Sequence, residues 1–154
     1  GRTGRELCLR VATVPGFVGG AILAGPIRFA CGPGRMPLGD WQHLGLADFS
    51  GIVRYKRELT LPRELDGARR LLLDLGHVRG TAEVAVDGSV AGVRVVAPYR
   101  FDLGELVRPG QTVTLEITIA NTLGPYLDAA SPTPFVLAGQ TVSGLFGPVR
   151  LLEG

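Results

Sequence analysis

The segment from Gln111 to Asn121 shows the most regular alternation of apolar and polar residues in the chain. Its odd-numbered positions from 113 to 119 are Val, Leu, Ile and Ile, and the positions between them carry Thr or Glu. Successive side chains of a β-strand point to opposite faces, so this alternation predicts a strand with one buried face and one wet face. A strand of this kind requires partner strands.

Short apolar runs separated by turn-forming residues recur along the rest of the chain. The sequence contains 23 Gly and 11 Pro among 154 residues, which favours many turns. The runs predict about eight or nine short strands, and tight connections between them favour antiparallel pairing. We therefore expect an all-β fold, specifically an antiparallel β-sandwich or jelly roll. Besides the segment above, the expected strands are residues 5–12, 21–31, 52–61, 71–75, 82–86, 90–96 and 144–152, with a brief pairing at 135–138.

Two short motifs predict how strands are connected. Asp87-Gly88 lies between two apolar runs and is the strongest hairpin signal in the chain, because both positions tolerate a positive φ. Residues 76–80, which begin and end with Gly, predict a bend that presents His77 and Arg79.

The chain length fits one domain, which we place at residues 1–154 with a core over about residues 21–152. No internal repeat, linker or second domain is evident. The chain starts with Gly and not with Met, so we expect it to be cut from a longer protein, and any targeting signal would lie outside it. The sequence therefore predicts no localisation.

Charge and hydropathy exclude several classes of partner. The chain has 16 basic and 14 acidic residues, a net charge of +2, and its basic residues are scattered, so we expect no nucleic-acid partner. No apolar run approaches the roughly 20 residues of a membrane span, so we expect no membrane partner.

The sequence predicts no cofactor. Cys8 and Cys31 face opposite ways in their expected strands, so two free thiols are expected rather than a disulfide. No cluster of ligands suits zinc. The loops also lack a dense Asp and Asn cluster, so a structural calcium ion stays possible but is not predicted.

Catalytic groups are sparse. The chain contains no Gly-x-Ser-x-Gly motif, and its only imidazoles are His43 and His77. A glycosidase needs two carboxylates that face one cleft. Most carboxylates here fall on wet strand faces or in turns, and only Asp40, Asp48 and Asp128 could meet at one end of a sandwich. We therefore expect no enzyme activity from this chain.

The residues outside the expected strands suit sugar binding better than catalysis. Aromatic rings cover the flat C–H faces of sugars, and polar side chains bond their hydroxyl groups. Trp41, the only Trp, lies in a long loop over residues 36–51, where it either contacts ligand or plugs one end of the sandwich. The chain is also irregular for about twenty residues after Asn121, and such loops are usually functional. The candidate sugar-binding residues are Trp41, His43, His77, Arg79, Tyr99, Arg100, Tyr126 and Asp128.

Several stretches in a fixed order resemble the galactose-binding-like β-sandwich that is attached to glycoside hydrolases. The most similar groups are the sugar-binding domain of family 2 and the C-terminal sandwich of family 106 α-L-rhamnosidase-like proteins. The resemblance covers about residues 25–152, and Asp87 stands where these domains usually have Asn. The stretches are Leu38-Gly-Asp-Trp41, Ser50-Gly-Ile-Val-Arg-Tyr-Lys-Arg-Glu-Leu-Thr-Leu-Pro62, Leu73-Asp-Leu-Gly76, Val84-Ala-Val-Asp-Gly88, Pro98-Tyr-Arg-Phe-Asp102, Arg108-Pro-Gly110 and Ser143-Gly-Leu-Phe-Gly-Pro-Val-Arg-Leu151.

The resemblance implies a non-catalytic module, because the catalytic carboxylates of these families lie in a separate barrel domain. The expected partners are a carbohydrate and the catalytic domain of a parent glycoside hydrolase. The first hypothesis is a carbohydrate-binding module, which predicts exposed rings at Trp41, Tyr99 or Tyr126 beside polar side chains. The alternative is a structural accessory sandwich that braces the catalytic domain, which predicts buried rings and an exposed apolar patch.

Overall fold

The computed structural model describes residues 34–63, 70–130 and 139–153. The chain divides into two units at Arg35, and the unit Met36–Gly154 is described below. The strands expected at 5–12, 21–31 and 135–138 lie outside the described residues, as do both cysteines. The prediction of free thiols and that of a single domain therefore stay predictions.

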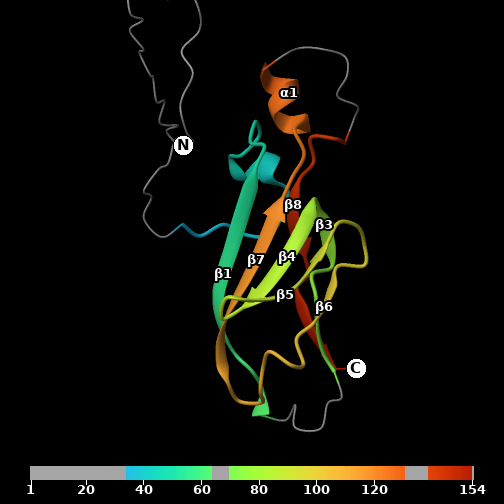
Figure 1. Ribbon diagram of the computed structural model, residues 1–154. Helices are drawn as coiled ribbons and strands as arrows, with labels where there is room; N and C mark the ends of the chain where they lie inside the picture. The colour runs from blue at the N-terminus through green and yellow to red at the C-terminus, as the bar shows by residue number, and fades with distance from the viewer. Residues whose placement is uncertain (1–33, 64–69, 131–138, 154) are drawn as a thin grey trace, which may run out of the picture. The chain divides into compact units, whose positions relative to one another are not determined.

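Short antiparallel strands dominate the second unit, with one turn of 3-10 helix and one short α-helix (Figure 1). No helix in the described ranges is long and apolar enough to cross a membrane. The elements are η1 (Trp41–Leu44), β1 (Ile52–Thr60), β2 (Leu71–Asp74), β3 (His77–Arg79), β4 (Thr81–Val86), β5 (Ser89–Arg94), β6 (Arg100–Asp102), β7 (Thr112–Ala120), α1 (Gly124–Ala130), β8 (Gly144–Gly147) and β9 (Arg150–Glu153).

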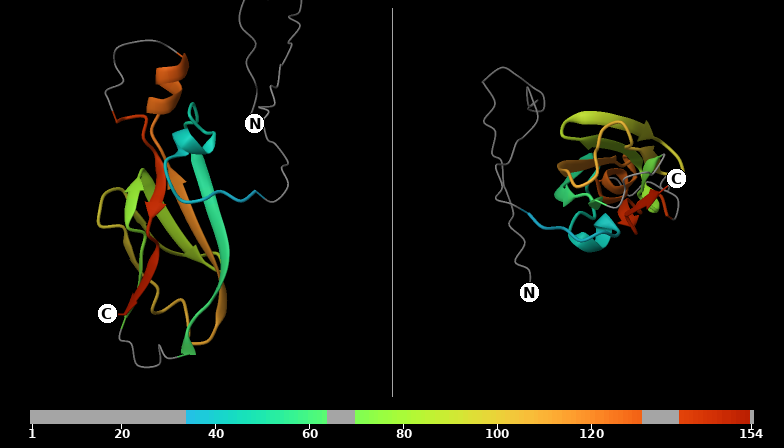
Figure 2. Two further views of the ribbon diagram at one scale, coloured as in Figure 1. Left: turned by 180° about the vertical axis from the view of Figure 1, so that it is seen from behind. Right: turned by 90° about the horizontal axis from the view of Figure 1, so that it is seen from below.

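The strands form a sandwich. One sheet has the order β1-β7-β4-β5 and another the order β6-β2-β9, while β3 and β8 pair as a short third ladder. Figure 2 shows the strands from behind and from below. Every strand pair in the described part of the chain is antiparallel. The prediction of an all-β, antiparallel sandwich is confirmed.

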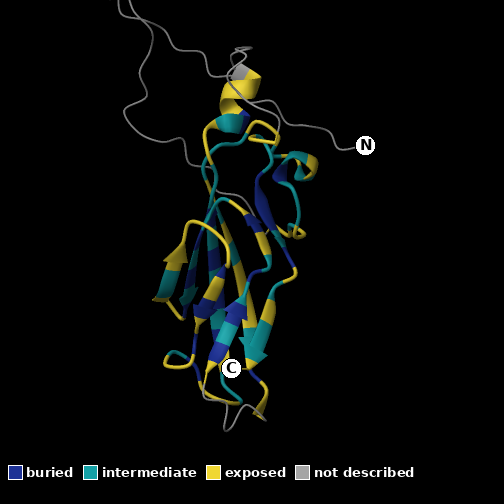
Figure 3. Cartoon of the chain, turned by 90° about the vertical axis from the view of Figure 1, so that its right-hand side faces the viewer, coloured by how far each residue is buried: buried dark blue, intermediate teal, exposed yellow. Residues whose placement is uncertain are grey.

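β7 holds a central place in the larger sheet, between β1 and β4. Its register places Ile117 opposite Tyr55 of β1 and Val84 of β4. The apolar positions 113, 115, 117 and 119 are buried, as the alternation predicted, and the Thr and Glu positions are partly or fully exposed (Figure 3). β1 is an edge strand, so its inward residues Val53 and Leu59 are only half-buried.

The core fills the space between the sheets. Side chains from both sheets and from the loops contribute to one continuous cluster, so the layers hold together mainly by burial of apolar surface. Its fully buried members with the largest side chains are Trp41, Phe101, Leu73, Leu75, Leu103, Ile119, Leu145, Val84 and Val86.

The hairpin between β4 and β5 forms at the predicted residues. Asp87 and Gly88 have φ values of 48° and 83°, which is the pair of positive φ angles of a type I′ turn. The Asp87 carboxylate accepts a hydrogen bond of 2.7 Å from the Thr114 N–H, and the Asp87 N–H donates to the Thr114 carbonyl. The hairpin is thus tied to the neighbouring strand β7.

Three sequence predictions about the path of the chain were wrong. Residues 77–79 form β3, which pairs with β8, rather than a simple bend. The segment after Asn121 contains α1, because Pro125 is tolerated in the first turn of a helix and Tyr-Leu-Asp-Ala-Ala follows it. The expected last strand is two strands, β8 and β9, with Pro148 between them.

Candidate functional site

Trp41 is a core residue. Its side chain is fully buried, and its indole N–H donates a 2.8 Å hydrogen bond to the Tyr55 hydroxyl. The Phe49 ring meets it edge to face, with 5.8 Å between centroids. Asp40 caps η1 by accepting from the Gln42 N–H, which fixes the turn that carries the indole. Trp41 therefore plugs the sandwich, and the prediction that it contacts a sugar is wrong because no ring face is open.

Gly144 explains how a ring of this size fits. Gly144 has a φ of 130°, and a Cβ atom built on it would lie 2.5 Å from the Gly39 carbonyl oxygen and 2.8 Å from Trp41 Cδ1. Only Gly permits this close approach of the β8 backbone to the indole. The pocket for Trp41 thus depends on a residue more than a hundred positions away in the sequence.

Tyr99 is also a core residue and cannot serve as a stacking platform, which corrects its assignment as a sugar-binding ring. Its hydroxyl donates a 2.8 Å hydrogen bond to the Gly80 carbonyl oxygen. Burial raises the pKa of Tyr99, and the positive charge of Arg79 opposes this shift. Burial likewise raises the pKa of Tyr55, against the hydrogen bond from Trp41.

Arg100 and Asp74 form an ion pair between β6 and β2. Arg100 Nε lies 2.8 Å from Asp74 Oδ2, and the Gly76 N–H donates to Asp74 Oδ1. The Gly76 hydrogen bond, followed by that of Arg100, holds the pKa of Asp74 below its usual range. Arg100 is exposed, but its guanidinium is paired with Asp74, so in this structure it supports the turn that Asp74 makes with Gly76.

The two histidines lie at different places on the surface. His43 on η1 is exposed, and its Nδ1 lies 3.7 Å from Asp40 Oδ2. His77 on β3 is exposed and packs against the Phe146 ring, with 4.8 Å between centroids. Neither histidine lines the pocket that contains Arg79.

Tyr126 and Asp128 lie on α1, and both are exposed. Tyr126 is 53% exposed, and Leu123 and Leu127 beside it are also exposed. Leu123 directly precedes α1, and Tyr126 and Leu127 follow it by three and four positions, so both lie near Leu123 at the start of the helix. We name these three residues the α1 patch. A second exposed apolar group, the β5 patch, follows the edge strand β5 and consists of Val90, Val93, Val95 and Val96.

Asn121 connects three segments where β7 ends. Its Oδ1 accepts a 2.7 Å hydrogen bond from the Gly51 N–H, and its Nδ2 donates to the Phe49 carbonyl and to Ser143 Oγ. Ser50 Oγ accepts from the Tyr126 N–H, which joins α1 to the same place. Sequence reasoning missed this role of Asn121, although a polar residue directly after a regular strand was a usable signal.

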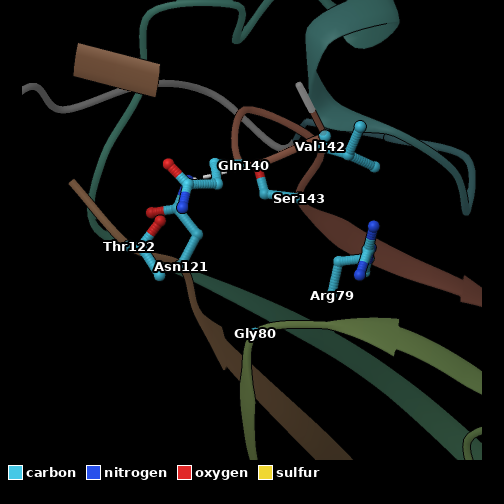
Figure 4. Close-up of a pocket in the computed structure, with 8 residues that line it drawn as sticks. Arg79, Gly80, Asn121, Thr122, Gln140, Val142 and Ser143 are labelled. Atoms are coloured by element: carbon cyan, nitrogen blue, oxygen red, sulfur yellow. Dashed lines mark hydrogen bonds between the residues drawn. The ribbon is translucent and has the colours of Figure 1, made fainter. Parts of the chain in front are cut away.

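A pocket of about 230 Å³ lies beside Asn121. Figure 4 shows Arg79 on one side of it and Asn121 and Thr122 on the other, with Ser143 between them. Arg79 is the only predicted sugar-binding residue that lines this pocket. The described lining residues are Arg79, Gly80, Asn121, Thr122, Gly139, Gln140, Val142 and Ser143.

A metal centre is not apparent in the part of the chain that the structure describes, where no three His, Cys, Asp or Glu residues gather. The prediction that no cofactor is needed stays a prediction.

Known proteins similar to the chain are glycoside hydrolases. No family model matches it. Mouse β-glucuronidase is 37% identical over 95 residues, which are 55% of this chain and 14% of that protein. A rhamnosidase from Novosphingobium sp. PP1Y superposes with a TM-score of 0.56 at 39% identity, covering 70% of this chain and 11% of that one.

A β-glucuronidase from Faecalibacterium prausnitzii shares the fold, with a TM-score of 0.54 and 24% identity over 83% of this chain and 27% of that one. The chain thus spans only a small part of the proteins that it matches. The likenesses to the mouse β-glucuronidase and the Novosphingobium rhamnosidase support a domain that is associated with glycoside hydrolases.

Proposed function

We propose that the chain is a non-catalytic accessory domain of a glycoside hydrolase, built on a galactose-binding-like sandwich, and that it braces the rest of a longer enzyme. The observation that carries this proposal is the position of the aromatic rings. Trp41 and Tyr99 lie inside the core, so they stabilise the fold and leave no ring face for a sugar. Tyr126 is instead exposed in an apolar patch.

The α1 patch is the proposed contact surface. Tyr is enriched among the residues that dominate interface energies, whereas Val and Leu are under-represented among them, so the comparison depends on Tyr126. The patch contains Tyr126 beside Leu123 and Leu127, whereas the β5 patch contains only Val. The α1 patch is therefore the better candidate, and the β5 patch supplies a matched control.

The pocket supports a non-catalytic role. Glycoside hydrolysis ordinarily needs two carboxylates on either side of the scissile bond. No Asp or Glu is among the lining residues that the structure describes. We expect the 154-residue chain to leave aryl glycosides intact, as measured by release of the chromophore.

The bracing role is tested in the longer enzyme. The double variant Tyr126→Ser and Leu127→Ser should lower the temperature at which that enzyme loses activity, because it removes apolar contact area. The control Val93→Ser with Val95→Ser removes a similar exposed apolar surface and should have little effect. Equal effects of both variants, or none, would contradict a specific contact through α1.

A second candidate function is carbohydrate binding. The pocket favours it, because a guanidinium, an amide and hydroxyl groups gather there beside the start of α1. A Cβ built on Gly124 of α1 would lie 2.7 Å from the backbone oxygen of Gln140, a pocket residue. Glycan-array binding of the 154-residue chain tests this function: selective binding supports it, and no binding leaves the bracing role alone.

A further inference from the structure

The charge of the pocket comes from one residue. Arg79 is the only charged side chain among the described lining residues, and within the described part of the chain it belongs to no ion pair. A guanidinium presents a planar fork of donors that matches a carboxylate. A pocket whose described lining contains one Arg without an ion pair and no acid therefore attracts an anionic group.

The hydroxyl groups of the pocket add further donors. Ser143 Oγ accepts a hydrogen bond from Asn121 Nδ2, and Thr122 Oγ1 accepts from the Gly124 N–H. A hydroxyl both donates and accepts, so each has its own O–H left to donate. Asn121 is engaged at both ends, and it holds these groups in place rather than meeting a ligand. The pocket thus suits a ligand rich in hydrogen-bond acceptors.

The volume of the pocket exceeds that of a lone carboxylate group. A water molecule occupies about 30 Å³ in the liquid, so the pocket of about 230 Å³ has room for a ring with its substituents. The Val142 side chain and the Cα methylene groups of Gly80 and Gly139 give the pocket apolar wall.

From this charge, donor set and volume, we propose that the pocket binds a monosaccharide that carries a carboxylate. Arg79 pairs with the carboxylate, and the exposed Thr122 hydroxyl donates to a ring or hydroxyl oxygen of the sugar. Ser143 is buried and forms part of the pocket wall. This proposal rests on the carbohydrate-binding function and names its ligand class. It is independent of the contact proposed for the α1 patch.

Nuclear magnetic resonance titration of the 154-residue chain tests the proposal. The probes are D-glucuronate and D-galacturonate, their neutral counterparts D-glucose and D-galactose, and acetate. An acidic sugar should shift the amide signals of Gly80, Thr122 and Ser143. The neutral sugars should bind about tenfold or more weakly, because they lack the charge-assisted hydrogen bonds to Arg79.

Arg79→Gln should weaken binding of the acidic sugar about tenfold or more and leave the unfolding curve unchanged, because Arg79 is exposed and makes no ion pair among the described residues. Arg108→Gln is the matched control: Arg108 is also exposed and precedes β7, whereas the pocket lies where β7 ends. The control should bind like the parent chain.

Each other outcome overturns the proposal in a distinguishable way. Equal binding of neutral and acidic sugars would leave carbohydrate binding standing and remove the role of the carboxylate. Equal binding of acetate and the acidic sugars would show a carboxylate site that does not recognise sugar. No shift with any probe would contradict both the ligand class and carbohydrate binding at this pocket.

Discussion

The core rings and the α1 patch use the same kind of residue for opposite purposes. Trp41 and Tyr99 are enclosed, and each donates its polar hydrogen to a group of the same fold. Tyr126 is half-exposed on a short helix, beside two exposed Leu side chains. The surroundings of an aromatic ring, rather than its presence in a loop sequence, therefore decide whether it supports the fold or is free to contact a partner.

The largest expected effect is on the core side of this comparison. Trp41→Ala should lower the free energy of unfolding by about 3–5 kcal/mol, because it removes a fully buried ring and leaves a cavity. Denaturant unfolding of the 154-residue chain measures this change. A loss below about 1 kcal/mol together with lost sugar binding would contradict this core role and show that Trp41 contacts the ligand.

Gly144→Ala tests whether the indole depends on the close approach of β8. The added Cβ meets the Gly39 carbonyl and the Trp41 ring, at a φ that side chains rarely adopt, so we expect a loss of about 1–3 kcal/mol or more. Gly88→Ala is the control: its φ is positive but no atom lies within 4 Å, so a loss of only about 1 kcal/mol is expected. Equal losses would show that strain alone matters at Gly144.

The lowered pKa of Asp74 predicts that the stability of the fold depends on pH in the acidic range. The pKa of Asp74 is lowered in the folded state, so its contribution to stability is complete above its unfolded pKa. That contribution is lost as the pH falls through the lowered folded pKa. In the variant Asp74→Asn, the free energy of unfolding should therefore fall less steeply as the pH is lowered. Denaturant unfolding at a series of acidic pH values measures this slope. An unchanged acid profile would contradict a role for the Gly76 and Arg100 hydrogen bonds.

The smallest effect on stability is expected for the α1 patch. Tyr126→Ser with Leu127→Ser should change the free energy of unfolding of the 154-residue chain by at most about 0.5 kcal/mol per site, because both side chains are exposed. Thermal unfolding by circular dichroism measures it. A loss of several kcal/mol would show that the patch supports the sandwich itself and would weaken its assignment as a contact surface.

Local patterns predicted the sheet well. The alternation in β7 fixed which side chains are buried, and the Asp87-Gly88 pair fixed the hairpin, because both signals depend only on neighbouring residues. α1 was missed because it is short and starts with Gly-Pro, a pair that usually marks a turn.

The site could not be predicted in the same way. The burial of Trp41 depends on Tyr55 and on Gly144, which local patterns do not connect to it. The pocket combines residues 79–80, 121–122 and 139–143, so only the tertiary fold brings Arg79 to the hydroxyl groups of Thr122 and Ser143. A list of polar and aromatic loop residues contained Arg79 but could not distinguish it from Arg100, which pairs with Asp74.

We propose that the α1 patch contacts the rest of a longer glycoside hydrolase. Hydrogen exchange tests this contact by comparing the amides of residues 126–128 in the 154-residue chain and in the longer enzyme. We predict slower exchange in the longer enzyme at these amides, with the β5 amides unchanged as an internal reference. Equal exchange of the α1 amides in the two proteins would contradict the claim.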